Sequence, residues 1–188
     1  AAANTYNLTI VHISTDYVFD GTKDSYTEDE TFSPISVYGR SKAEGDKEAL
    51  KAVKHYILRT SWVIGEGHNF VRIMMGLAEK NISPTVVNDQ IGRLTFTTEL
   101  VRAIDHLLTK KAPYGVYNMT NSGDPASWAD ITREIFKLLG REDLDVSDTT
   151  TAEYFAGKEN IAPRPLKSTL NLAKIIATGF EPRGWKEN

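Results

Sequence analysis

Tyr38 and Lys42 are the residues whose types and spacing are best suited to chemistry. They stand four positions apart in the segment Y-G-R-S-K, a spacing that places two side chains on the same face of a helix. A phenol is a poor acid–base group at neutral pH because its ordinary pKa is about 10, and a cation held beside it favours the phenolate. Such a pair suits the delivery of a proton to a ketone oxygen while a hydride reaches the carbon.

The same spacing also fits a surface tyrosine and lysine on an amphipathic helix, because Y-x-x-x-K is a short and common pattern. A second segment bears on this choice. Residues 14–21 read S-T-D-Y-V-F-D-G and follow an apolar run, so Thr15 is expected at the end of a strand, where a hydroxyl can polarise a carbonyl group. Thr15 and Asp16 would alternatively close the strand as a local turn.

Alternating strands and helices are expected to position these groups. The hydrophobic pattern predicts strands at 8–14, 56–61, 85–87 and 115–119, and helices at 36–53, 69–80, 97–109 and 127–139, with Ser36 and Ser127 as caps and Gly140 as a stop. This alternation predicts an α/β fold with parallel strands. A glycine-rich phosphate-binding turn is not found between a strand and a helix. We therefore expect the chain to start in the middle of a larger fold.

Taken together, residues 14–21 and 34–42 resemble the extended short-chain dehydrogenase/reductase superfamily, and the S-T-D-Y-V-F-D-G segment is similar to that of dTDP-4-dehydrorhamnose reductases. The resemblance implies that Thr15, Tyr38 and Lys42 form the catalytic set. Four further segments agree with this family in their order along the chain: L-R-T-S-W-V at 58–63, N-F-V at 69–71, N-D-Q-I-G-R-L-T at 88–95 and R-P-L-K-S-T-L at 164–170. Leu94 stands where the family more usually has proline, which affects the expected shape of that loop.

The resemblance also implies ligands and the residues that hold them. The cofactor would be NADPH or NADH, and Mg²⁺ is a further candidate, although the four scattered histidines show no metal-ligand spacing. The expected cofactor-binding residues are Ser14, Tyr38, Lys42 and Thr60. The expected substrate-binding residues are Thr15, Asp16, Tyr17, Trp62, Asn69 and Arg164. From the residues alone, Trp62 equally fits core packing and Arg164 equally fits a surface loop, although its guanidinium would suit a pyrophosphate.

The family has a doubly wound parallel sheet of the Rossmann type with a smaller α/β substrate-binding lobe. Residues 1–62 are thus expected to be the remnant of a dinucleotide-binding domain. Residues 63–188 would be mainly the substrate-binding lobe, with some segments returning to the sheet. The N-terminal cofactor-binding half would be missing, so the chain alone is expected to be inactive.

The activity that the resemblance implies is reduction of the 4-keto group of dTDP-6-deoxy-L-lyxo-4-hexulose to dTDP-L-rhamnose, a precursor of cell-surface polysaccharide. Two alternatives stay open. One is another nucleotide-sugar epimerase or dehydratase of the superfamily. The other is a non-catalytic regulatory subunit similar to that of methionine adenosyltransferase.

Composition limits the partners. The 22 basic and 25 acidic residues give a net charge of −3, which does not favour nucleic acid or an anionic membrane surface. The chain has no apolar run long enough to span a bilayer, and Ala-Ala-Ala-Asn at its start does not resemble a signal peptide. Cysteine is absent, which fits a reducing cytoplasm. Besides a nucleotide sugar, the expected partners are a second copy of the chain or the pathway epimerase, fused or associated.

Overall fold

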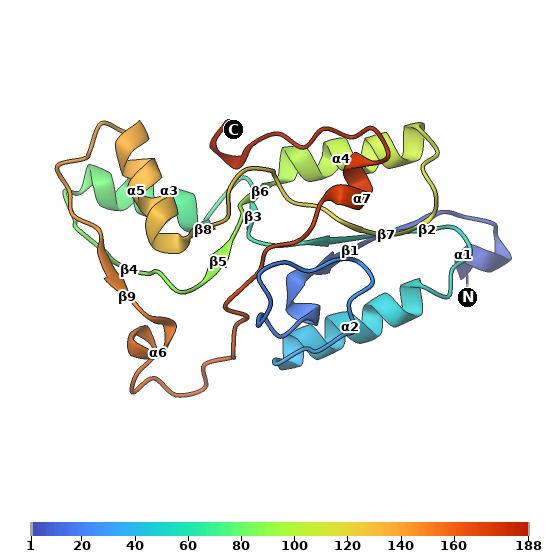
Figure 1. The fold of residues 1–188 in the computed structure, drawn as a ribbon, viewed down its shortest axis with the longest axis horizontal. Coiled ribbons are helices and arrows are strands. Elements are labelled where there is room, and N and C mark those ends of the chain that lie inside the picture. The colour runs from blue at the N-terminus through green and yellow to red at the C-terminus, as the bar shows by residue number, and fades with distance from the viewer. Residues whose placement is uncertain (1, 188) are drawn as a thin grey trace.

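A parallel sheet of three strands forms the centre of the molecule, which a computed structural model describes over residues 2–187 (Figure 1). The strands are β1 (Ile10–Thr15), β2 (His55–Thr60) and β7 (Gly115–Asn118), in the order β1-β2-β7. Every residue of β2 after the first is buried. This near-continuous burial is what a parallel strand covered on both faces requires, and it explains why the apolar run in the sequence does not alternate.

Helices cover both faces of this sheet. Helix α2 (Val37–Ala49) lies on one face, and α4 (Thr97–Thr109) and α7 (Ala173–Ile176) lie on the other (Figure 1). The face toward α4 and α7 carries one apolar cluster, which includes Tyr56, Leu58, Leu100, Leu107, Tyr117, Met119 and Ile175. Because residues from 97 onward pack on a sheet that begins at residue 10, the later part of the chain returns to the first.

A second apolar cluster lies in a smaller lobe. It is formed around α3 (Phe70–Glu79) and α5 (Trp128–Leu138), which lie side by side in Figure 1. The lobe also contains the parallel pair of β4 (Thr85–Val87) and β9 (Ser147–Thr149). Each helix has a side-chain cap: Asn69 accepts a hydrogen bond from Arg72, and Ser127 forms a reciprocal capping box with Asp130.

Short elements connect the sheet to the lobe. Strands β3 (Val63–Ile64) and β6 (Thr95–Phe96) pair in parallel, and β5 (Ile91–Gly92) and β8 (Ala126–Ser127) pair antiparallel. The remaining elements are α1 (Ala2–Thr5), α6 (Thr151–Tyr154) and two 3₁₀ turns at Asp16–Val18 and Trp185–Glu187.

The α/β class with parallel strands is confirmed, and so are most of the predicted elements. The helix at 97–109 has the expected bounds, and Ser36 caps α2 by accepting a hydrogen bond from the Gly39 N–H at 3.0 Å. The prediction that α2 extends to residue 53 was wrong, because this helix ends at Ala49. The Val53 N–H is held instead by the Asn4 side chain at 2.9 Å, a long-range contact that local periodicity does not reveal.

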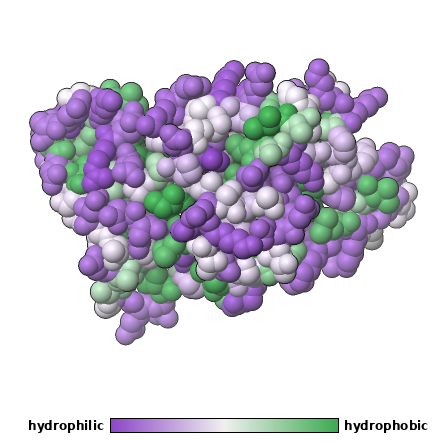
Figure 2. All heavy atoms as spheres, in the orientation of Figure 1, coloured by the Kyte–Doolittle hydropathy of each residue, from purple (hydrophilic) through white to green (hydrophobic). Residues whose placement is uncertain are grey.

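The described residues contain no helix with the length and apolarity needed to cross a membrane. Figure 2 shows a face on which hydrophilic residues dominate and apolar residues form small, separate patches.

A buried ion pair fastens α2 to the sheet. Asp46 on α2 is fully buried and accepts a hydrogen bond from Arg59 Nε on β2 at 3.2 Å. On the other side of this carboxylate, His12 Nε2 of β1 lies 3.2 Å from Oδ1. The Arg59 guanidinium also contacts the ring faces of Phe19 and Phe32 and donates to a backbone carbonyl of the loop between β1 and α2. One carboxylate therefore fixes α2 against two strands.

We expect Asp46→Ala to lower the free energy of unfolding by about 3–5 kcal/mol, because removal of one partner leaves the other charge buried and unpaired. Urea denaturation measures this. The matched control is Glu44→Ala on the same helix, which breaks an exposed pair with Lys47 and should cost less than about 1 kcal/mol. Equal losses in the two variants would contradict the role of Asp46.

Candidate active site

A cleft of about 350 Å³ opens where β1 and β2 end. The two strands pair in parallel with Thr15 opposite Thr60, so their carboxyl ends coincide, which is where ligands bind in open α/β sheets. Most of the predicted site residues line this cleft. Its lining consists of Ile13, Ser14, Thr15, Asp16, Tyr17, Tyr38, Lys42, Thr60, Ser61, Trp62 and Val63.

Tyr38 and Lys42 enter the cleft from successive turns of α2. The Lys42 ammonium donates a hydrogen bond to the Ile13 carbonyl at 2.7 Å, which ties it to the end of β1. Tyr38 is 52% exposed and meets the Tyr17 ring edge-on, with the ring centroids 5.4 Å apart. The phenol is thus held by its ring on one side and remains accessible to a ligand.

Gly39 allows this approach of α2 to the cleft. A Cβ atom at Gly39 would lie 2.2 Å from the Tyr17 carbonyl oxygen and 3.0 Å from Cβ of Pro34. Real atoms do not approach so closely, so any larger residue would push the first turn of α2 away from Tyr17. The close contact between helix and 3₁₀ turn depends on the absence of a side chain at this position.

Thr15 and Asp16 are both buried at the floor of the cleft. The Thr15 hydroxyl donates to Asp16 Oδ1 at 3.0 Å and accepts from the Tyr17 N–H at 3.2 Å. Thr15 thus makes the local turn bond that was the alternative to a catalytic role, and it also lines the cleft. Burial raises the pKa of Asp16 to about 6, with the hydroxyls of Ser168 and Thr15 acting in the opposite direction.

Three buried hydroxyls in the cleft have no hydrogen-bond partner among residues 2–187. They belong to Ser14, Thr60 and Ser61. Buried polar groups nearly always have a partner, and one without a partner calls for an explanation such as a ligand. The cofactor-binding roles expected of Ser14 and Thr60 stay predictions.

A second cavity, of about 610 Å³, adjoins the small lobe and is mostly apolar. Arg164 lines it and lies over the Phe155 ring at 5.7 Å. The charge of Arg164 also reaches the cleft, because it opposes the effect of burial, which raises the pKa of Tyr17. Arg164 therefore lines the second cavity and is close enough to the cleft residue Tyr17 to affect its pKa.

Asn69 is the predicted site residue that lines neither space. Its amide nitrogen donates to the carbonyls of Gly65 and Gly67, and its oxygen caps α3. These bonds hold the Asn69 side chain against neighbouring backbone groups. Substrate contact by Asn69 stays a prediction.

Sequence reasoning missed most of the second cavity, including Gln90, Trp128, Tyr154 and Phe155. Gln90 accepts a hydrogen bond from the Trp128 indole at 3.2 Å and donates to the Thr151 hydroxyl at 3.0 Å. The sequence placed Asp89 and Gln90 in a segment that resembles the family but predicted no site role for them. Two adjacent polar residues before a buried glycine were the available signal, but their partners lie about 40 and 60 residues away.

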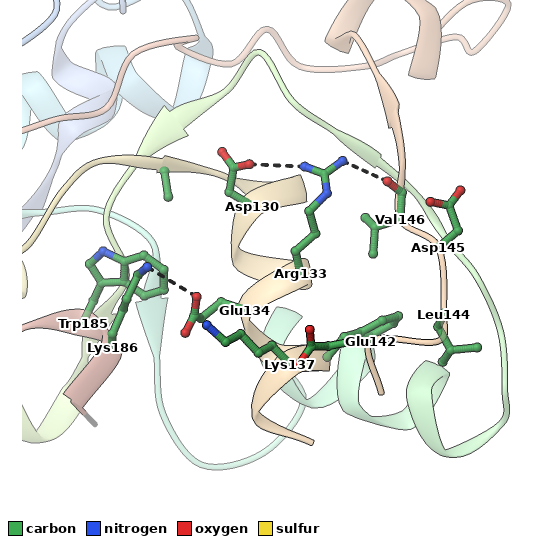
Figure 3. Close-up of a pocket in the computed structure, with 12 residues that line it drawn as sticks. Asp130, Arg133, Glu134, Lys137, Glu142, Leu144, Asp145, Val146, Trp185 and Lys186 are labelled. Carbon is green, nitrogen blue, oxygen red and sulfur yellow. Dashed lines mark hydrogen bonds and ion pairs between the residues drawn. The ribbon is translucent and has the colours of Figure 1, made fainter. Parts of the chain in front are cut away.

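A third hollow, of about 420 Å³, lies against α5 and is rich in charged residues (Figure 3). Arg133 lies between Asp130 and the carbonyl of Val146, and Lys186 reaches Glu134. These charges largely satisfy one another. Trp185, a buried tryptophan on this side of the lobe, lines the hollow and is not among the residues that line the cleft.

Within the described part of the chain, no group of three or more histidine, cysteine or acidic side chains could hold a metal ion. The expected Mg²⁺ is therefore without support from the structure.

The fold and cleft place the chain in a class of parallel α/β proteins that present a Tyr-x-x-x-Lys helix at the carboxyl ends of two strands. Comparisons with known proteins agree. The crystal structure of a Clostridium acetobutylicum dTDP-4-dehydrorhamnose reductase matches with a TM-score of 0.89 and 39% identity, covering 100% of this chain and 65% of that one. The Bacillus anthracis reductase, solved in complex with NADP, matches with a TM-score of 0.88 and 32% identity over 99% of this chain and 65% of that one.

The chain belongs to the family described as the RmlD substrate binding domain, which matches residues 1–188. Among curated proteins, the dTDP-4-dehydrorhamnose reductase of Aggregatibacter actinomycetemcomitans is 40% identical over 201 aligned positions, covering 98% of this chain and 66% of that protein. The resemblance inferred from the motifs is thereby confirmed. The chain spans a little less than two thirds of the length of these relatives.

The raised pKa of Asp16 predicts a pH-dependent loss of stability. Its carboxyl group keeps its proton to about pH 6 when folded but only to about 3.8 when unfolded, so the folded state binds more protons between these values. The contribution of Asp16 is therefore fully present below pH 3.8 and is lost as the pH rises to 6, by about 3 kcal/mol.

Urea unfolding of the wild type and of Asp16→Asn, from pH 3 to pH 7, measures this as a change in the difference between the two proteins. Asp20→Asn provides a control of opposite sign, because hydrogen bonds from Tyr26 and Thr22 lower the pKa of Asp20 to about 2. A difference between wild type and Asp16→Asn that does not vary with pH would contradict the assignment.

Proposed function

We propose that the full-length protein reduces the 4-keto group of dTDP-6-deoxy-L-lyxo-4-hexulose to dTDP-L-rhamnose with NADPH, whereas this chain alone is expected to be inactive. The observation that carries the proposal is the convergence of a hydroxyl, a phenol and an ammonium group, from Thr15, Tyr38 and Lys42, on one cleft at the ends of two strands. Membership of the reductase-containing family supports the choice of substrate, and the chain's intact Tyr-Lys pair favours a catalytic over a purely regulatory role.

Tyr38 is the proton donor in this proposal. It gives its phenolic proton to the ketone oxygen as the carbon is reduced, and the negative charge left on the phenolate is stabilised by Lys42. The hydrogen bond from Lys42 to the Ile13 carbonyl keeps the ammonium at the end of β1 rather than in solvent. The pair stays aligned because both residues lie on α2.

Thr15 polarises the same oxygen. Its hydroxyl hydrogen points to Asp16 in the structure, so it must turn toward the substrate to donate a hydrogen bond there. The backbone bond from Tyr17 to the Thr15 oxygen does not involve this hydrogen and can be retained. Donors aimed at the developing oxyanion are usually among the largest contributions to catalysis.

A reduced nicotinamide cofactor, when bound, would supply the hydride. Ser14, Tyr38, Lys42 and Thr60 are the residues proposed to hold it, supported by the unpartnered hydroxyls of Ser14 and Thr60. NADPH is favoured because the B. anthracis relative was solved with NADP, and NADH stays the alternative.

The nucleotide end of the substrate is proposed to lie in the 610 Å³ cavity, with Arg164 facing its pyrophosphate. A guanidinium can form paired hydrogen bonds to phosphate oxygens. Asp16, Tyr17 and Trp62 would then surround the sugar in the cleft. Arg164 is placed suitably for this, since it lines the cavity and its charge acts on Tyr17.

The division at residue 62 is kept as a proposal. Residues 1–62 would belong to the dinucleotide-binding domain, and residues 63–188 mainly to the substrate-binding lobe, with β7, α4 and α7 on the sheet. A cytoplasmic location, and association with a second copy or with the pathway epimerase, are proposals that rest on the absent cysteine and on the family resemblance.

We expect Tyr38→Phe to lower kcat by about a hundredfold or more, because a positioned acid–base group supplies roughly that much. The assay uses the full-length protein and follows oxidation of NADPH together with formation of dTDP-L-rhamnose, because only a reductase consumes reduced cofactor stoichiometrically. Tyr6→Phe is the matched control, since Tyr6 is exposed and outside the cleft lining. A loss of less than about tenfold in Tyr38→Phe would remove Tyr38 as the proton donor.

A further inference from the structure

Trp62 lies in the wall of the cleft in an unusual backbone conformation. Its φ angle is +49°, a left-handed value that is rare for a bulky residue. Such a conformation persists only where the surroundings impose it, and it tends to occur at functional sites. Thr95 supplies part of the constraint, because its N–H donates to the Trp62 carbonyl at 3.1 Å and its hydroxyl donates to the Ser61 carbonyl at 2.6 Å.

The Trp62 ring makes close contact with Trp128 and with Gly92. It stacks on Trp128, with ring centroids 3.8 Å apart and planes inclined by 17°. It also lies against Gly92, where an added Cβ atom would come within 2.9 Å of the indole atom Cε2. The ring therefore has little freedom to move away from Trp128 or toward Gly92.

Trp128 is itself fixed by the small lobe. It is the first residue of α5, its indole N–H donates to Gln90 Oε1 at 3.2 Å, and the Phe70 ring packs against it at 4.4 Å. Gln90 is in turn bound to Thr151. Trp62 lines the cleft whereas Trp128 lines the second cavity, so the stacked pair connects the two spaces.

We propose that Trp128 is a positioning residue for the reaction. Its stack on Trp62, together with the close contact of Gly92, holds the Trp62 ring where it can orient the reacting sugar. This inference rests on the proposed function. It assigns to α5, an element that contributes no lining residue to the cleft, control over how the ketone is presented to Tyr38.

Two substitutions disturb Trp62 through different contacts. Trp128→Phe weakens the stack and removes the bond to Gln90, and Gly92→Ala pushes the ring without substituting a residue that lines either space. We expect each to lower kcat/KM for the nucleotide sugar by about threefold to tenfold, the range that an aromatic pair supports, while Gly92→Ala leaves the affinity for dTDP alone unchanged.

The matched control is Trp185→Phe. Trp185 belongs to the same apolar cluster, is buried and loses a comparable indole hydrogen bond to Asp124. Trp185→Phe should reduce thermal stability but leave kcat/KM within about twofold of the wild-type value. Unchanged kinetics in both Trp128→Phe and Gly92→Ala, or an equal loss in Trp185→Phe, would overturn the proposal.

A spectroscopic readout separates this inference from the proposed function. Two indole rings stacked this closely should give an exciton couplet in circular dichroism. The couplet should vanish in Trp128→Phe, weaken in Gly92→Ala and persist in Trp185→Phe. If the full-length wild type does not reduce the nucleotide sugar, the proposed function fails, and the couplet still tests the placement of Trp62. A couplet that survives Trp128→Phe overturns the positioning role.

Discussion

The parallel pairing of β1 with β2 is the constraint on which the rest of the molecule depends. Its register sets Thr15 beside Thr60, so the polar residues that follow each strand meet at one edge. A shift of this register by one residue would turn the side chains of a whole strand to the opposite face. The burial of β2 on both faces makes such a shift costly. The relative positions of the residues that line the cleft are therefore fixed by that burial.

Helix α2 is located by a second constraint, which acts through charge. Asp46 lies one turn beyond Lys42 in a run in which Tyr38, Lys42 and Asp46 recur every four residues, so all three lie along one side of α2. Lys42 is bound to the end of β1, and Asp46 is bound to Arg59 of β2. The helix is thus attached to the sheet at two heights, and its rotation is fixed where Tyr38 enters the cleft.

The sequence was sufficient for the parts of the fold governed by local periodicity. The helix at 97–109 and the caps at Ser36 and Ser127 follow from apolar spacing and side-chain chemistry, and the motif order led to Thr15, Tyr38 and Lys42. The second cavity could not be foreseen, because Gln90, Trp128 and Arg164 meet only through tertiary packing. The left-handed conformation of Trp62 was equally hidden, since it is imposed by Thr95, Trp128 and Gly92 rather than by its own preference.

Gly39 restricts which residues can stand next to Tyr38. Because a Cβ atom there would collide with the Tyr17 carbonyl, the second position of the Tyr-x-x-x-Lys pattern is closed to other residues in this protein, whereas the third and fourth, Arg40 and Ser41, face solvent and are free to vary. The useful search string for proteins built in this way is therefore Tyr-Gly-x-x-Lys. A natural variant with any side chain at the second position would have to carry a compensating change in the turn that bears Tyr17.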